Sequence, residues 1–191
     1  MNIFTILGSP RNHGNTAGVL DMVERELSVG HRIDRLNIAS VTINGCLGCG
    51  SCRKDPDQPG CVQKDDAMAV FERMMAADAA IYSTPLYCWD FSAQMKALID
   101  RHFCLVTGYG TTDHRSLIAG KPAALLVTCA GPVENNADVI QTVFNRVCAY
   151  SKARVVNKTV VPFCTTPDAL GESARAAARK MAGDINGALR R

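Results

Sequence analysis

Four cysteines in the first third of the chain have a spacing that could support metal or redox chemistry. Cys46, Cys49 and Cys52 lie three residues apart, and Cys61 follows after the spacer RKDPDQPG. This compact spacing is typical of iron–sulfur sites, where one loop supplies three ligands to a [4Fe–4S] cube and Cys61 is available as the fourth. Zinc sites more often use two separated Cys-x2-Cys pairs, which makes zinc the weaker hypothesis. Reduced thiols or a facultative cysteine pair stay open as alternatives to a metal.

The other cysteines are read from their positions in the sequence. The 191 residues include nine cysteines, an odd number that excludes complete pairing within one chain. No apolar run could span a bilayer and the N-terminus lacks a signal-peptide pattern, so we expect a cytoplasmic protein with reduced thiols. Cys129, Cys148 and Cys164 fall in strand or helix patterns and are predicted to be core residues. Cys88 lies between two aromatic residues, where a small structural role is favoured over a redox role, and Cys104 has no assigned role.

A polar loop, GSPRNHGNT, follows an apolar segment at the N-terminus and precedes apolar residues with helical spacing. The free N–H groups at the start of a helix favour binding of an anion. Ser9, Asn15 and Thr16 add hydrogen-bonding groups, and Arg11 adds a charge suited to phosphate. The loop lacks the P-loop and Gly-x-Gly-x-x-Gly patterns, which disfavours nucleoside triphosphates and a standard dinucleotide site. The structural alternative is that Asn15 caps the helix while Ser9 and Pro10 shape a turn.

A second loop, STPLYCWDFSAQ, presents Tyr87 and Trp89, the one tryptophan of the chain. Exposed aromatic side chains on a proline-stiffened backbone suit contact with a flat ring system. The same side chains could instead pack into the core or into a subunit interface, and an interface role is compatible with ligand contact.

Short apolar segments alternate with segments of helical periodicity along the chain. The predicted strands are residues 2–7, 32–38, 79–83, 122–129 and 153–161, and the predicted helices are residues 16–27, 65–77, 92–103, 136–151 and 168–189. This alternation predicts an α/β fold with a single domain at residues 1–191 and helices on both faces of a parallel sheet. The strand order 2-1-3-4-5 of flavodoxin-like sheets is favoured, with ligands beyond the carboxyl ends of the strands where the winding reverses.

Together, the segments GSPRNHGNT, INGCLGCGSC with GCVQKDD, and TPLYCWDFSAQMKALIDR resemble the NAD(P)H-dependent FMN reductase family, including its iron–sulfur flavoprotein branch. The resemblance implies a bound FMN. It assigns the phosphate to Ser9, Arg11, Asn15 and Thr16, the isoalloxazine ring to Pro85, Leu86, Tyr87 and Trp89, and the far edge of the ring to Ala130 and Gly131. It also implies a [4Fe–4S] cluster on Cys46, Cys49, Cys52 and Cys61, although the spacer before Cys61 is longer than in that branch.

The resemblance predicts an FMN-dependent oxidoreductase that takes electrons from NAD(P)H and passes them to a flavin, a quinone-like, nitro or azo compound, or a metal centre. An electron carrier between the cluster and FMN is the alternative, and a non-flavin zinc module is a third hypothesis. No side chain is assigned as a catalytic acid or base.

The expected partner is a small-molecule or protein electron acceptor. The 21 basic and 18 acidic residues are scattered, so neither nucleic acid nor a membrane is expected. The family resemblance implies a homodimer or tetramer. The long connection at residues 104–120 is expected to shape the acceptor site.

Overall fold

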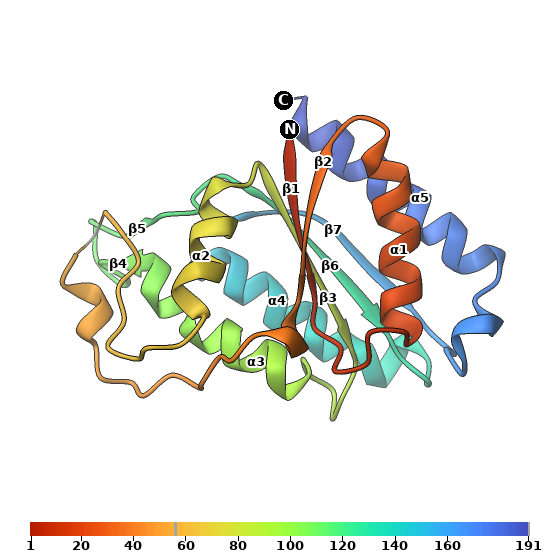
Figure 1. The fold of residues 1–191 in the computed structure, drawn as a ribbon, viewed down its shortest axis with the longest axis horizontal. Coiled ribbons are helices and arrows are strands. Elements are labelled where there is room, and N and C mark those ends of the chain that lie inside the picture. The colour runs from red at the N-terminus through yellow and green to blue at the C-terminus, as the bar shows by residue number, and fades with distance from the viewer. Residues whose placement is uncertain (56, 191) are drawn as a thin grey trace.

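A five-stranded parallel sheet forms the centre of the computed structural model, which describes residues 1–55 and 57–190 (Figure 1). The strands are β1 (Asn2–Leu7), β2 (Arg32–Asn37), β3 (Ala79–Pro85), β6 (Pro122–Thr128) and β7 (Arg154–Val161). They lie in the order β2-β1-β3-β6-β7, and each neighbouring pair is parallel. Along the chain this order is 2-1-3-4-5, so the predicted flavodoxin-like sheet is confirmed.

Helices cover both faces of the sheet, as predicted. They are α1 (Asn15–Ser28), α2 (Ala67–Ala76), α3 (Ala93–Asp100), α4 (Asp138–Tyr150) and α5 (Glu172–Leu189). Leu20 of α1 and Met181 of α5 belong to the core on one face. Phe71, Met95 and Phe144, from α2, α3 and α4, belong to the core on the other face. Figure 1 shows the two helical layers on opposite sides of the strands.

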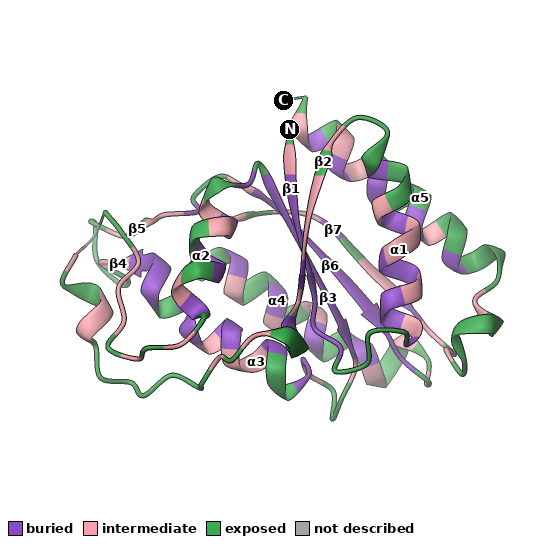
Figure 2. Ribbon diagram, in the orientation of Figure 1, coloured by how far each residue is buried: buried purple, intermediate pink, exposed green. Residues whose placement is uncertain are grey.

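The two central strands that follow β1 in the sheet are completely buried. Every residue of β3 and β6 is buried, whereas Leu36 is the one buried residue of the edge strand β2 (Figure 2). A strand with helices on both faces needs apolar residues on both sides, which explains the continuous apolar runs in β3 and β6. Three polar residues are also buried in these strands, Ser83, Thr84 and Thr128, and Ser83 donates its hydroxyl to the carbonyl oxygen of Ile6 at 2.6 Å. The carboxyl ends of β1 and β3 are therefore held firmly side by side.

Two of the predicted helices differ from the observed helices by more than two residues at one end. The third ends at Asp100 and continues as a 3-10 segment, η3 (Arg101–Leu105). The last begins at Glu172, because the extended residue Gly171 separates it from a 3-10 turn, η5 (Pro167–Ala169). None of the helices in the described ranges has the length and hydrophobicity that crossing a bilayer requires.

The long connection at residues 104–120 contains a hairpin that the sequence did not predict. Its strands, β4 (Val106–Thr107) and β5 (Arg115–Ser116), pair with each other and stay outside the main sheet. Strands this short leave no detectable periodicity in the sequence. The preceding segment η3 packs against η2 (Ser51–Arg53), so the connection lies beside the cysteine loop (Figure 1).

A buried pair of polar side chains connects the sheet to η3. Oη of Tyr82 lies 3.0 Å from Nε2 of His102, and Nδ1 of His102 lies 3.0 Å from the carbonyl oxygen of Leu98. A carbonyl oxygen can only accept, so Nδ1 carries the proton and Nε2 accepts from the Tyr82 hydroxyl. Burial lowers the pKa of His102 to about 4. A histidine that is neutral at neutral pH therefore holds η3 against the core.

We predict that His102 makes the fold sensitive to mild acid. In the unfolded chain His102 binds a proton near its ordinary pKa of 6.5, but in the folded chain only near a pKa of about 4. The unfolded state binds more protons between these values, so the free energy of unfolding falls as the pH decreases from 6.5 towards 4. Urea unfolding over this range should show a smaller loss for His102→Asn than for the wild type. An equal loss in both proteins would contradict the assignment.

Candidate functional site

The carboxyl ends of β1, β3 and β6 open into a pocket of about 280 Å³, which we call the switch-point pocket. Its volume lies near the lower end of the range of about 300–1,000 Å³ for small-molecule sites. Eight of the ten residues predicted to contact FMN line it: Ser9, Arg11, Asn15, Thr16, Pro85, Leu86, Tyr87 and Ala130. The loops after the first, third and fourth strands thus converge on one site, as the strand order requires.

The loop between β1 and α1 forms the polar side of the switch-point pocket. The Ser9 hydroxyl accepts from the amide of Arg11 and donates to its carbonyl oxygen, both at 3.1 Å, which makes a turn. The N-cap of α1 is Gly14, and no side chain caps this end, so Asn15 does not cap the helix as the structural alternative proposed. The N–H groups of the first turn and the helix dipole therefore favour an anion at this position.

Asn15 carries a buried polar atom that has no partner. Its Oδ1 accepts no hydrogen bond from the described residues, although the residue lines the pocket. Such an acceptor is costly unless a bound molecule supplies a donor. A ligand with a phosphate and hydroxyl groups fits both features, because the phosphate suits the helix N-terminus and a hydroxyl suits Oδ1. FMN has this chemistry in its phosphate and ribityl chain.

Ser92 joins the two sides of the switch-point pocket. Its hydroxyl donates to the carbonyl oxygen of Gly8, directly after β1. Oγ of Ser92 also accepts from the amide of Met95 at 3.2 Å and so caps α3. The Ser92 amide donates to the hydroxyl of Thr84, near the end of β3, at 3.1 Å. These bonds fix the loop after β1 relative to the loop after β3.

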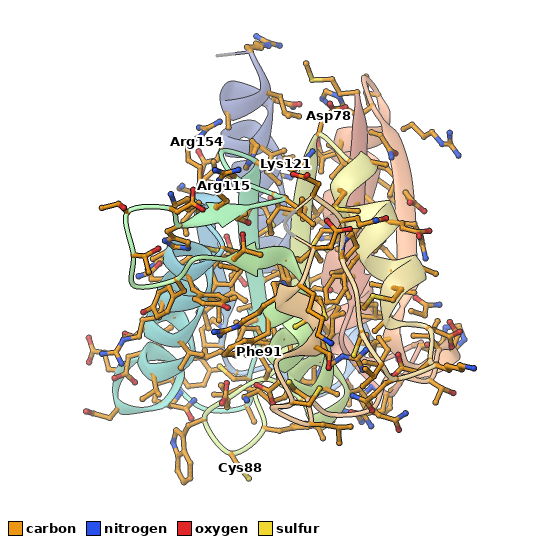
Figure 3. All side chains as sticks on the ribbon, turned by 90° about the vertical axis from the view of Figure 1, so that its left-hand side faces the viewer. Asp78, Cys88, Phe91, Arg115, Lys121 and Arg154 are labelled. Atoms are coloured by element: carbon orange, nitrogen blue, oxygen red, sulfur yellow. The ribbon has the colours of Figure 1, made fainter. Side chains whose placement is uncertain are left out.

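The loop after β3 ends in a tight hairpin at the rim of the pocket. Tyr87 and Asp90 exchange backbone hydrogen bonds of 3.1 and 3.0 Å, and Cys88 and Trp89 at the tip have φ values of 48° and 64°. A left-handed backbone costs about 1–2 kcal/mol for a residue with a Cβ, so the tip is strained. Figure 3 shows Cys88 at the outer end of this loop and the buried Phe91 inside the protein. Cys88, for which a structural role was favoured over a redox role, is exposed at this tip.

Two residues predicted to contact FMN do not line the switch-point pocket. Trp89 is 58% exposed at the hairpin tip, outside the lining residues, whereas Tyr87 lies within them. Gly131 is also outside the lining, and a Cβ at this position would lie 3.0 Å from Nδ2 of Asn136. Trp89 lies at the tip of the hairpin, between the paired positions Tyr87 and Asp90.

Four lining residues were missed by the sequence analysis. They are Thr128, Cys129, Cys164 and Thr165. Cys129 and Cys148 are buried as predicted, but Cys164 is half-buried in the loop after β7, which corrects its assignment to the core. The sequence did place Cys164 directly after the last predicted strand. Ligands bind at this end of a parallel sheet, so its position could have indicated a place in the pocket lining.

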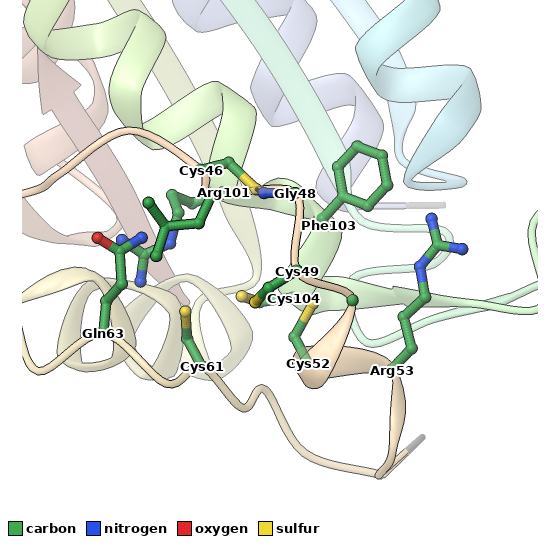
Figure 4. A pocket seen from close by; sticks show the side chains of 12 residues that line it. Cys46, Gly48, Cys49, Cys52, Arg53, Cys61, Gln63, Arg101, Phe103 and Cys104 are labelled. Atoms are coloured by element: carbon green, nitrogen blue, oxygen red, sulfur yellow. Dashed lines mark hydrogen bonds between the residues drawn. The ribbon is translucent and has the colours of Figure 1, made fainter.

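A second pocket, of about 230 Å³, gathers five cysteines (Figure 4). We call it the cysteine pocket; its cysteines are Cys46, Cys49, Cys52, Cys61 and Cys104. The four predicted metal ligands therefore lie together despite the long spacer, in which Pro56 is outside the described residues. Cys104, which had no assigned role, joins them from η3, a contact between distant segments that spacing alone could not reveal.

The thiols of the cysteine pocket differ in their environments. Hydrogen bonds from the backbone and side chain of Ser51 lower the pKa of the exposed Cys49 thiol. Burial, with the neighbouring Cys52 and Cys61, raises the pKa of Cys104 to about 12. The pocket thus has a solvent-facing side that favours thiolate and an inner side that favours the protonated thiol.

Arg101, in the lining of the cysteine pocket, forms a buried ion pair with Asp65. The side chains of Arg101 and Asp65 are 1% and 2% exposed, with Nη1 2.8 Å from Oδ2. Nη1 also donates to the carbonyl oxygen of Asn44 at 3.0 Å, and Asp65 accepts from the Asn44 amide at 2.9 Å. Burial opposes both charges, but the hydrogen bond between the two side chains contributes to a lowered pKa of Asp65 and a raised pKa of Arg101. The pair fixes the start of the cysteine loop against η3.

The donor set of the cysteine pocket fits an iron–sulfur cluster better than a single ion. Among the described residues, no three Cys, His, Asp or Glu side chains are placed to hold one metal ion. A [4Fe–4S] cluster has a different requirement, because each iron takes one thiolate and the ligands surround a cube. Five thiols around one cavity match this cluster in ligand type and supply more than the required number.

The fold and the switch-point pocket define a flavodoxin-like α/β protein with a site suited to a phosphorylated ring compound. A family model described as NADPH-dependent FMN reductase matches residues 1–168. The chain therefore belongs to the NADPH-dependent FMN reductase family, and the resemblance found in the sequence is confirmed.

The curated relatives of the chain include several iron–sulfur flavoproteins. One from Archaeoglobus fulgidus is 37% identical over 132 residues, which cover 69% of this chain and 56% of the relative. One from Methanosarcina thermophila is 37% identical over 106 residues, which cover 55% of this chain and 54% of the relative. The chain thus spans about half the length of these curated relatives.

Solved structures support the fold. An NAD(P)H:quinone oxidoreductase from Methanothermobacter marburgensis has a TM-score of 0.70 at 21% identity, with coverage of 97% of this chain and 95% of the other. An FMN-dependent NADH-azoreductase from Bacillus anthracis has a TM-score of 0.67 at 12% identity, with coverage of 97% and 99%. At these identities the likeness establishes the architecture alone.

We predict that Ser92→Ala lowers the free energy of unfolding in urea by about 2 kcal/mol. It removes an N-cap, which contributes about 0.5–2 kcal/mol, and leaves the Gly8 carbonyl without this donor. Ser28→Ala is the matched control, because its hydroxyl bonds only the Arg25 carbonyl at an exposed helix end, and it should change stability by less than about 0.5 kcal/mol. Equal losses in the two variants would contradict the role of Ser92.

Proposed function

We propose that the switch-point pocket binds FMN. The observation that carries this proposal is the convergence of Arg11, an uncapped helix N-terminus and the unpaired Asn15 acceptor on one pocket. In this proposal Ser9, Arg11, Asn15 and Thr16 hold the phosphate and ribityl chain, while Pro85, Leu86, Tyr87 and Ala130 contact the ring. Trp89 and Gly131 stand outside the lining and contact the ring only at the rim.

The chain contributes binding and electrostatics to this site. Bound FMN supplies the hydride and electron transfer that protein side chains cannot perform alone. Neither histidine nor a carboxylate is among the lining residues, so we assign no catalytic acid or base. The dipole of α1 and the charge of Arg11 favour the anionic end of the cofactor, and Tyr87 and Leu86 exclude water from one side of the ring.

We infer that the protein is an NAD(P)H-dependent flavin oxidoreductase. The electrons pass from NAD(P)H to a flavin, a quinone-like, nitro or azo compound, or a metal centre. The family description, which names NADPH, and structural neighbours named as a quinone oxidoreductase and an azoreductase support this class of reaction.

A second proposal concerns the cysteine pocket. We infer that it holds a [4Fe–4S] cluster on Cys46, Cys49, Cys52 and Cys61. The clustering of these thiols and the names of the iron–sulfur flavoprotein relatives support it. With both groups bound, the alternative function is an electron carrier that relays electrons between the cluster and FMN.

We also propose that the chain forms a homodimer or tetramer and passes electrons to a small-molecule or protein acceptor. Tyr87 and Trp89 are 41% and 58% exposed at the rim of the switch-point pocket, and exposed aromatic side chains suit a second subunit. Gel filtration that gives only a 20.5 kDa monomer would contradict the oligomer.

We predict that Arg11→Gln weakens FMN binding at least about tenfold and leaves riboflavin binding nearly unchanged. Riboflavin has the same ring and ribityl chain but no phosphate, so FMN alone loses a charged hydrogen bond of about 1.5–3 kcal/mol. Fluorescence titration of the apoprotein measures both affinities, and Arg25→Gln, which lies outside both pockets, is the control. If Arg11→Gln weakens the binding of FMN and of riboflavin equally, Arg11 does not bind the phosphate.

We predict that anaerobic addition of NADH or NADPH bleaches the flavin absorbance of the holoprotein. The enzyme proposal requires this result, because the reduced nicotinamide is the electron donor. The carrier alternative predicts no change with either nucleotide and bleaching by a reduced ferredoxin. That second pattern would contradict the enzyme proposal and leave the FMN site intact.

A further inference from the structure

The buried guanidinium of Arg101 has a donor that the protein leaves unused. Its Nη atoms bond Asp65 and the carbonyl oxygen of Asn44, but Nε is buried and has no partner among the described residues. The side chain lines the cysteine pocket, and Figure 4 shows it beside the cysteines. A buried donor without an acceptor is costly, so an acceptor that the chain does not supply would stabilise this side chain.

The groups around Arg101 indicate the chemistry of that acceptor. Cysteines line the pocket together with Arg101, among them Cys49, Cys61 and Cys104. A protonated thiol is a weak acceptor, whereas a metal-bound thiolate or an inorganic sulfide carries negative charge and accepts strongly. The Asp65 carboxylate offsets the formal charge of Arg101, so the pair presents an N–H dipole to the pocket. An anionic sulfur atom in the cysteine pocket would supply the missing acceptor.

A second ion pair, outside the cysteine pocket, shows an arginine whose Nε is hydrogen-bonded within the protein. In the pair between Arg73 and Asp34, Nε of the arginine bonds Oδ2 at 3.1 Å and Nη2 bonds Oδ1 at 2.6 Å. Nε and one Nη of this arginine therefore both bond to the carboxylate. Arg101 instead uses Nη1 and Nη2 for Asp65, which leaves Nε unpaired in the wall of the cysteine pocket.

We propose that Arg101 donates Nε–H to a sulfur atom of the iron–sulfur cluster in the cysteine pocket and raises the reduction potential of the cluster. This inference rests on the cluster proposed above and assigns Arg101 as a hydrogen-bond donor to the cluster, not as a ligand of iron. Hydrogen bonds to the sulfur atoms are among the factors that set cluster potentials. Reduction adds negative charge, so a fixed donor stabilises the reduced state more than the oxidised state.

The test compares the cluster potential of anaerobically purified holoprotein in the wild type, Arg101→Lys and Arg73→Lys. Lysine keeps the positive charge beside Asp65 but has no N–H at the position of Nε. Arg73→Lys makes the same change at an ion pair whose members line neither pocket. Redox titration followed by electron paramagnetic resonance measures the potential, with iron assayed on every sample.

The expected result is a lower potential for Arg101→Lys and an unchanged potential for Arg73→Lys. An unchanged potential in Arg101→Lys with full iron content would overturn the inference. If Arg101→Lys fails to fold or to retain iron, the wild type labelled with 15N-arginine decides: pulsed electron paramagnetic resonance of the reduced cluster should detect a coupled arginine nitrogen, and the absence of such a coupling overturns the inference. A wild-type chain that binds FMN without iron would overturn the proposed cluster together with this role, and the iron assay separates the two failures.

Discussion

Between β1 and β3 the chain starts to wind in the opposite direction, so the loops after these neighbouring strands leave towards opposite faces of the sheet. The crevice between the loops is the switch-point pocket. A hydrogen bond from Ser92 to the Gly8 carbonyl fixes one side, and the hydroxyls of Thr16 and Thr128, 2.7 Å apart, hold the start of α1 against the end of β6. The polar side of the pocket is therefore formed before a ligand binds, which lowers the entropic cost of binding.

The segment that leaves the switch-point pocket also reaches the cysteine pocket. The loop after β3 lines the first pocket, α3 follows it, and η3 lines the second. The 8 residues of α3 span about 12 Å at about 1.5 Å per residue. Two buried contacts hold η3 in place: His102 bonds Tyr82 of the sheet, and Arg101 bonds Asp65 next to the cysteine loop. The two proposed redox sites are thereby joined by one short, well-anchored segment.

The sequence carried enough information to predict the sheet, its strand order and most of the switch-point pocket, because these follow from local periodicity and the rules of parallel sheets. It could not predict contacts between distant segments. Cys104 and Arg101 enter the cysteine pocket through the packing of η3, and Cys164 reaches the switch-point pocket through an irregular loop after β7. Trp89 was assigned by its type, but the left-handed tip of the hairpin, with φ of 64°, places it outside the lining.

We propose that one chain holds FMN in the switch-point pocket and an iron–sulfur cluster in the cysteine pocket. The most direct measurement is an absorption spectrum of anaerobically purified protein, with iron and acid-labile sulfide assayed on the same sample. The account predicts flavin bands above a broad sulfur-to-iron absorption and about four irons per chain. Flavin bands without iron would contradict the cluster, and a protein that takes up no flavin even after FMN is added would contradict the account as a whole.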